Sequence, residues 1–122
     1  MEQIANNERS RVLTNASLRA ANYMNLSNTE LSHVLGVSPS TITRMQQGSY
    51  EIAQGSKPWE MASLLTRLYR GLDAIMAGDN VSLLSWIDSP NNHLRAVPKE
   101  LIMSTEGLVR TLAYVDSSRA RV

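Results

Sequence analysis

The chain contains no cysteine and no phenylalanine, and only 5% of its residues are aromatic. Without cysteine there is no disulfide framework and no thiolate metal site, which fits the reducing interior of a cell. The two histidines, His33 and His93, lie far apart and have no ligand pattern around them, so we expect no metal site. Without phenylalanine the core has to be built from Leu, Ile, Val, Met and Ala, a composition that favours helices.

Long apolar runs and catalytic motifs are missing as well. No run approaches the length of a membrane span, and the N-terminus has no signal-peptide layout, so we expect a cytoplasmic protein with no membrane partner. The sequence has no G-x-S-x-G, no Gly-rich phosphate loop and no H-E-x-x-H motif, and its carboxylates are spread singly along the predicted helices. We therefore expect no enzyme, no catalytic residue and no cofactor.

The stretch SNTELSHVLGVSPSTITRMQQG carries the clearest local pattern in the sequence. Ser27 and Glu30 have the S-x-x-E spacing of a capping box, and an apolar stripe with helical spacing follows them. Gly36 ends this first helix, and Ser38 with Pro39 begins a second helix at once. Two short helices joined by a few residues, with Gly at the corner, indicate a helix-turn-helix.

The outward side chains of the second helix favour DNA binding over the alternative, an ordinary helical hairpin that never meets DNA. They are short or flexible donors and acceptors, suited to phosphates and base edges. The net charge is +1, from 12 Lys and Arg against 11 Asp and Glu, which is low for a DNA-binding protein. A single copy would bind double-stranded DNA weakly, so two or more copies are needed. The predicted DNA-binding residues are Ser38, Ser40, Thr41, Thr43, Arg44 and Gln47.

The rest of the chain is expected to be helical, with one boundary. Residues 8–24 form an amphipathic helical pattern after a polar segment, residues 1–7, that we expect to be frayed. Residues 49–58 contain Gly, Ser and Pro with a single apolar anchor, which indicates a connection between lobes. We therefore predict an all-α protein with a helix-turn-helix domain at 1–55 and a helical C-terminal domain at 56–122.

The segment from Trp59 to Ala77 is the longest helical pattern, and its apolar stripe is wide. A stripe this wide on a small protein is expected to pack on more than one neighbour. The pattern fits core throughout, and it fits equally well core on one side with a homodimer interface on the other. The residues assigned to dimerisation are Trp59, Leu65, Leu68, Tyr69 and Leu72.

In the C-terminal part, the sequence pattern predicts a short helix that begins at Pro98 and a last helix that begins after Ser104. Gly107 lies in the first turn of that last helix, where Gly costs about 1 kcal/mol relative to Ala, so we expect a close backbone contact there. Residues 116–122 form a polar, charged tail that is expected to be untied. The apolar side of the last helix is predicted to consist of Leu108, Val109, Leu112, Ala113 and Val115.

The two halves of the chain together resemble a known family. The helix-turn-helix resembles that of the Xre class of bacterial repressors. The segment from KPWEMASLL, followed by LLSWIDSPNNHL, the PKELI run and the ending GLVRTLAYVDSSRARV, resembles the C-terminal domain of the Xre/MbcA/ParS antitoxins. One departure is the pair Arg95 and Ala96, which stands where the family usually has two glycines. This pair takes positive φ less readily, so we expect the loop to run differently.

The resemblance implies the antitoxin of a type II toxin–antitoxin module, encoded beside a RES-domain toxin that depletes cellular NAD. Antitoxins of this family block the toxin's active site through their C-terminal domain. They also bind the promoter of their own operon, and they form homodimers and larger toxin–antitoxin assemblies. The alternative is a stand-alone dimeric transcriptional repressor without a toxin partner. The residues assigned to toxin binding are Glu106, Arg110, Tyr114, Asp116, Arg119, Arg121 and Val122.

Overall fold

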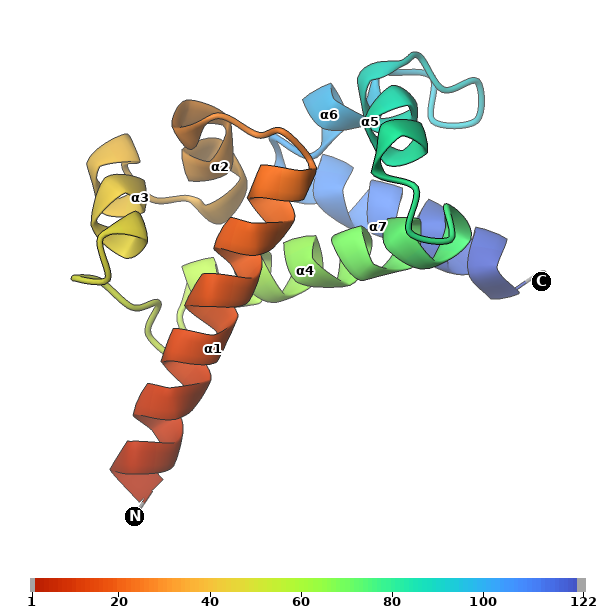
Figure 1. Ribbon diagram of the computed structural model, residues 1–122. Coiled ribbons are helices and arrows are strands. Elements are labelled where there is room, and N and C mark those ends of the chain that lie inside the picture. The colour runs from red at the N-terminus through yellow and green to blue at the C-terminus, as the bar shows by residue number, and fades with distance from the viewer. Residues whose placement is uncertain (1, 121–122) are drawn as a thin grey trace.

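The computed structural model describes residues 2–120, with side chains from residue 7 onward, and within them the chain forms seven helices and no strand (Figure 1). The prediction of an all-α fold is confirmed. An isolated bridge between Asn91 and Ala96 closes one loop. The helices are α1 (Glu2–Tyr23), α2 (Asn28–Leu35), α3 (Pro39–Gln46), α4 (Lys57–Ile75), α5 (Asn80–Asp88), α6 (Pro98–Leu101) and α7 (Thr105–Ala120).

Helix α4 lies at the centre of the fold and packs against α1, α2, α5 and α7. The side chain of Ser56 caps its start by accepting a hydrogen bond from the Trp59 N–H at 3.3 Å. Figure 1 shows α1 crossing the first part of α4 and α7 running along the remainder. The helix is buried on several sides by these neighbours, which explains the width of its apolar stripe.

The hydrophobic core is continuous from the helix-turn-helix to the last helix. Fully buried side chains of the N-terminal half pack in the same cluster as those of the C-terminal half. The proposed division between residues 55 and 56 therefore separates two stretches of sequence that share one core. Members of this cluster are Met24, Leu31, Leu35, Ile42, Ile52, Leu65, Leu68, Leu83, Ile87, Leu108 and Val115.

Two helix ends differ from the sequence prediction. Helix α1 begins at Glu2 rather than at residue 8, so it includes residues that we expected to be frayed, and its first turns project beyond the other helices in Figure 1. Helix α7 continues to Ala120, although we expected an untied tail from Asp116. The end of α7 packs on α4, where Val115 is buried and Cδ of Arg119 lies against Gly71. The Asp116 carboxylate also accepts a hydrogen bond from Nη2 of Arg67 on α4 at 3.1 Å.

Gly107 makes the close backbone contact that the sequence predicted. A Cβ atom at this position would lie 1.8 Å from the carbonyl oxygen of Leu101, at the end of α6. The N–H of Gly107 donates to the side-chain oxygen of Ser104 at 3.1 Å, so Ser104 caps the start of α7. The turn between α6 and α7 is therefore tight enough to exclude every residue except glycine.

The loop that follows α5 places Arg95 at φ +57°, in the left-handed region. The Arg95 N–H donates to the Asn91 carbonyl at 2.7 Å, and the Asn91 N–H donates to the Ala96 carbonyl at 2.9 Å. These bonds hold a conformation that usually belongs to glycine. We expected the loop to run differently because Arg95 takes positive φ less readily than glycine, yet Arg95 adopts positive φ here and the hydrogen bonds of the loop hold it there.

Replacing Arg95 with Gly is expected to stabilise the protein. The left-handed conformation costs a residue with a Cβ roughly 1–2 kcal/mol, and part of this gain is lost to the greater freedom of Gly in the unfolded chain. We expect a net gain of about 1 kcal/mol, or a rise in Tm of roughly 3–5 °C in thermal unfolding. Ala96→Gly, one residue along and not at positive φ, is the matched control and is expected to lower Tm. An unchanged or lower Tm for Arg95→Gly would show that the position carries no strain.

Candidate DNA-binding and toxin-binding surfaces

Local capping bonds build the helix-turn-helix from α2 and α3. The Ser27 hydroxyl accepts from the Glu30 N–H at 3.0 Å, and the Glu30 carboxylate accepts from the Ser27 N–H at 2.8 Å, so the capping box is formed. Gly36 ends α2 at φ +74°, and its N–H donates to the Ser32 carbonyl. Ser38 then caps α3 by accepting from the Thr41 N–H at 3.2 Å. The prediction of a helix-turn-helix is confirmed.

Helix α3 exposes five of the six side chains that the sequence assigned to DNA, namely Ser38, Ser40, Thr43, Arg44 and Gln47. The sixth, Thr41, is buried, with 8% of its surface exposed. Its hydroxyl oxygen accepts a hydrogen bond from Nη2 of Arg44 at 3.1 Å. Thr41 is therefore placed to position Arg44 rather than to reach DNA itself.

Arg44 is held from two sides. Besides the bond to Thr41, its guanidinium carbon lies 5.7 Å from the centre of the Tyr50 ring, which is cation–π distance. A side chain held in this way loses less freedom on binding than a free arginine. Tyr50 lies in the connection after α3, and no local pattern in the sequence pointed to it.

A reciprocal amide pair joins the start of α2 to the end of α3. Nδ2 of Asn28 donates to Oε1 of Gln46 at 3.2 Å, and Nε2 of Gln46 donates to Oδ1 of Asn28 at 3.0 Å. Both side chains are exposed, so the pair lies on the surface next to the predicted DNA-binding residues. No local pattern in the sequence indicates this pair, because the two residues are 18 positions apart.

Lys99 on α6 connects the helix-turn-helix to the C-terminal half. Its ammonium group donates to the Asn25 carbonyl at 3.1 Å and lies 3.6 Å from the Glu30 carboxylate and 3.7 Å from that of Asp88. The hydrogen bond from the Ser27 N–H, with a further contribution from Lys99, holds the pKa of Glu30 below its ordinary value. The capping box of α2 and the start of α6 thus share one charged contact.

Several of the residues assigned to toxin binding make contacts within the chain. Arg110 donates through Nη2 to the carbonyl of Leu94, which fastens the 91–96 loop to α7. Asp116 pairs with Arg67, as described above. The side chain of Arg119 crosses α4 at Gly71, where a Cβ atom would lie 3.5 Å from Cδ of Arg119. These three side chains therefore help to fix the position of α7 on the fold.

Tyr114 lies between two other aromatic rings. Its ring centre is 6.5 Å from that of Trp86 on α5 and 5.5 Å from that of His93 in the loop, and both pairs are stacked. Such pairs add about 0.5–1.5 kcal/mol beyond the burial of their area. These two contacts join α5, the 91–96 loop and α7.

Helix α7 presents an outward stripe that the sequence analysis assigned to the core. Val109 is 48% exposed, and Glu106 and Ala113 on the same side are exposed too. The assignment of Val109 and Ala113 to the buried side was wrong, because the buried face of α7 follows the helical spacing of Gly107, Leu108, Thr111, Leu112 and Val115. A stricter use of that spacing would have separated the two stripes. Arg121 and Val122 lie outside the described residues.

Comparison with known families agrees with this geometry. Residues 4–67 match the antitoxin Xre-like helix-turn-helix domain. The chain belongs to the Xre-like antitoxin family. Residues 71–121 match the antitoxin Xre/MbcA/ParS C-terminal toxin-binding domain, so the antitoxin combines a helix-turn-helix with a toxin-binding domain. Both matches reach into α4, the helix that organises the shared core. No curated protein matches the chain.

The residues assigned to dimerisation of the antitoxin fall into two groups. Leu65, Leu68 and Leu72 are at most 1% exposed and pack inside the core of one protomer. They have no surface to offer a second copy. Trp59 and Tyr69 are partly buried, and the Tyr69 ring stacks on that of Tyr23 with their centres 5.5 Å apart. Only these two of the five can reach a partner without opening the core.

The described part of the antitoxin has neither a membrane-spanning helix nor a cluster of metal ligands. Among residues 2–120, no helix combines the length and the apolarity needed to cross a membrane. Within the same residues, no three His, Cys, Asp or Glu side chains gather closely enough to hold a metal ion.

Proposed function

We propose that this antitoxin neutralises a RES-domain, NAD-depleting toxin by covering the toxin's active site with its C-terminal region. One observation supports the proposal most strongly. Residues 71–121 match a toxin-binding domain, and stacked contacts of Tyr114 with Trp86 and His93 hold α5, the 91–96 loop and α7 of this segment together, with Val109 of α7 48% exposed beside them. A surface whose elements are already held together loses little freedom on binding, which suits a protein interface.

The part of this surface that enters the toxin is proposed to be α7 and the residues that follow it. Glu106, Val109 and Ala113 form the outward stripe, and Arg110, Tyr114, Asp116 and Arg119 hold α7 in place while leaving part of their surface exposed. The proposal also includes Arg121 and Val122, which follow α7 in the sequence. The small side chain of Ala113 allows a partner to approach α7 closely.

The second proposed activity is repression of the antitoxin's own operon. Helix α3 exposes hydroxyl, amide and guanidinium groups on one side, which is the usual arrangement of a recognition helix in the major groove. The net charge of +1 makes a single copy a weak DNA ligand. We therefore propose that the antitoxin binds promoter DNA as a homodimer, with one helix-turn-helix on each half-site.

Replacing Arg44 with Ala is expected to weaken operator binding about tenfold while leaving toxin binding unchanged. Arg44 is the one charged side chain among the predicted DNA-binding residues, and a specific arginine contact is worth about 1–3 kcal/mol. A mobility-shift titration at fixed salt measures the change. Arg95→Ala removes the same charge from the C-terminal half and is the matched control. Equal affinity for wild type and Arg44→Ala would remove Arg44 from the DNA-binding site.

Co-expression with the neighbouring gene tests the proposed partner. The tagged antitoxin is purified, and the mass of whatever accompanies it is measured. Recovery of an untagged RES-domain protein in a fixed ratio is the expected result. If the antitoxin is recovered alone and still binds its promoter, the chain acts as a stand-alone repressor.

A further inference from the structure

An open groove runs between α1 and α4, in the part of the chain that precedes the toxin-binding match. Its volume is about 490 Å³, within the roughly 300–1,000 Å³ of typical small-molecule sites. All of its lining residues lie between Glu8 and Arg70, whereas the toxin-binding match begins at residue 71. None of them is among the predicted DNA-binding residues. Neither toxin binding nor DNA binding, as proposed above, therefore uses this groove.

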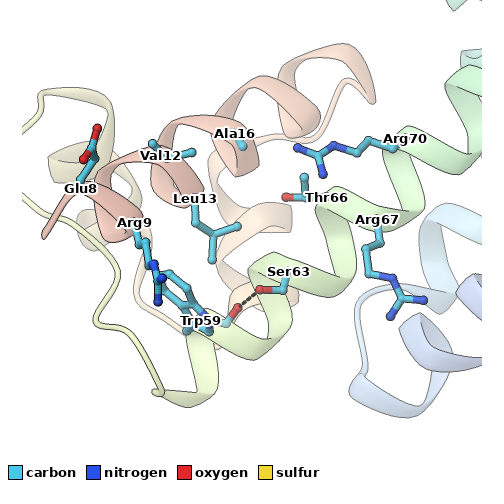
Figure 2. Close-up of a pocket in the computed structure, with 10 residues that line it drawn as sticks. All are labelled: Glu8, Arg9, Val12, Leu13, Ala16, Trp59, Ser63, Thr66, Arg67 and Arg70. Carbon is cyan, nitrogen blue, oxygen red and sulfur yellow. Dashed lines mark hydrogen bonds between the residues drawn. The ribbon is translucent and has the colours of Figure 1, made fainter. Parts of the chain in front are cut away.

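The middle of the groove is apolar. Figure 2 shows Val12, Leu13 and Ala16 of α1 along one wall, and the Trp59 ring at one end of the α4 wall. Val12 is 59% exposed. An apolar ligand that covered Val12 would remove this surface from water, which favours binding.

Two hydroxyl groups of the α4 wall are already used inside the helix. The Ser63 hydroxyl donates to the Trp59 carbonyl at 2.9 Å, and the Thr66 hydroxyl donates to the Ala62 carbonyl at 2.8 Å. These hydroxyls have no hydrogen left for a ligand, and the backbone groups of α1 and α4 are bonded within their own helices. The middle of the groove therefore suits a hydrocarbon chain better than an extended peptide, whose backbone would find no partners there.

The two ends of the groove differ in charge. Glu8 and Arg9 lie together at the end near the start of α1, so their charges offset each other (Figure 2). Arg67 and Arg70 line the opposite end. Arg67 is paired with Asp116, whereas Arg70 forms no ion pair within the described residues, and its side chain extends toward α1 in Figure 2. An unpaired cation therefore marks this end as the place for an anionic group.

The length of the groove indicates an elongated ligand. Trp59 and Arg70 line its two ends and are 11 residues apart on α4, which corresponds to a rise of about 16 Å along the helix. A compact anion would reach Arg70 and leave the apolar walls uncovered. A chain with one charged end would cover the walls and meet Arg70 together.

We infer that the groove binds an aliphatic monocarboxylate of medium chain length. The carboxylate accepts hydrogen bonds from the Arg70 guanidinium, a charge-assisted contact that is stronger than one between neutral groups. The hydrocarbon chain lies along Val12, Leu13 and Ala16 and ends near the Trp59 ring. The inference does not depend on the identity of the toxin or of the operator.

Fluorescence of Trp59 is the first test, with decanoate as the probe. The chain has two tryptophans, so Trp86→Phe leaves Trp59 as the only reporter. Titration with decanoate below its micelle concentration is expected to change the Trp59 emission saturably, with a dissociation constant below about 1 mM. Decanol has the same chain without the charge, and it is expected to bind about tenfold more weakly.

Two substitutions in the same Trp86→Phe background separate the head of the ligand from its chain. Arg70→Gln is expected to weaken decanoate about tenfold and to leave decanol unchanged, because only the carboxylate uses the guanidinium. Arg95→Gln removes the same charge outside the groove and is the matched control. Ala16→Leu fills the groove with a residue that also favours helix, and it is expected to weaken both probes. Circular dichroism checks that each variant keeps its helix content.

Three results would overturn the inference, and none of them touches the proposed neutralisation of the toxin. The first is the lack of a saturable change up to about 5 mM decanoate. The second is equal affinity for decanoate and decanol, or for decanoate with and without Arg70, which would leave an apolar surface without a carboxylate site. The third is Trp59 emission that changes on dilution of the protein but not with decanoate, which would show that a second copy fills the groove.

Discussion

Replacing Gly107 with Ala is expected to destabilise the protein by about 3 kcal/mol or more and to disrupt the packing of α7. The added Cβ would lie 1.8 Å from the Leu101 carbonyl oxygen, a backbone atom that cannot rotate away. Relief requires α6 and α7 to move apart, which opens the core around Leu108 and Ile102. Urea denaturation followed by circular dichroism measures the loss.

Gly36→Ala is the matched control for this substitution. Gly36 has φ +74° and no heavy atom within 4 Å of the position that a Cβ would take. The control therefore carries only the cost of the left-handed conformation, about 1 kcal/mol. If Gly107→Ala costs no more than Gly36→Ala, the turn between α6 and α7 is looser than the structure shows. Toxin binding of the Gly107 variant is expected to fall together with its stability.

Replacing Val109 with Asp is expected to abolish toxin binding without loss of stability. The side chain is 48% exposed on α7, so a carboxylate there stays solvated in the free antitoxin. In the complex the same carboxylate would be buried without a partner, which costs several kcal/mol and lowers affinity at least a hundredfold. Binding to the purified toxin is measured by isothermal titration calorimetry.

Val81→Asp provides the control, because it introduces the same charge at a valine that is 79% exposed on α5, outside the outward stripe of α7. The control is expected to bind the toxin like wild type. Unchanged affinity of Val109→Asp, with both variants folded, would show that the outward stripe of α7 does not face the toxin. The contact would then have to lie elsewhere on the C-terminal half.

The helix-turn-helix could be predicted from the sequence because its signals are local. The capping box at Ser27, the left-handed turn at Gly36 and the second cap at Ser38 each lie within four residues of their partners. The close backbone contact at Gly107 was also predicted from a local signal. A glycine inside a helical turn is unfavourable, so its presence indicates a neighbour that leaves no room for a side chain. Such short-range patterns determine local structure before tertiary contacts are known.

The long-range contacts could not be predicted in this way. Three contacts join residues that share no periodicity in the sequence. They are the cation–π contact of Arg44 with Tyr50, the amide pair of Asn28 with Gln46, and the ion pair of Arg67 with Asp116. The stripe of α4 was wide enough for core and interface together, and only the packed structure shows that its leucines are core. The groove beside α1 has no sequence signal, because it arises from how two helices cross.

Inhibition of NAD consumption by the purified antitoxin is the most direct test of the proposed neutralisation. The proposed partner, a RES-domain protein encoded by the neighbouring gene, is incubated with NAD, and the antitoxin is added at increasing molar ratios. We expect NAD consumption to fall to background at a fixed stoichiometric ratio, Val109→Asp to fail to inhibit, and Arg44→Ala to inhibit like wild type. NAD consumption that continues unchanged at a large excess of wild-type antitoxin would contradict the proposed neutralisation.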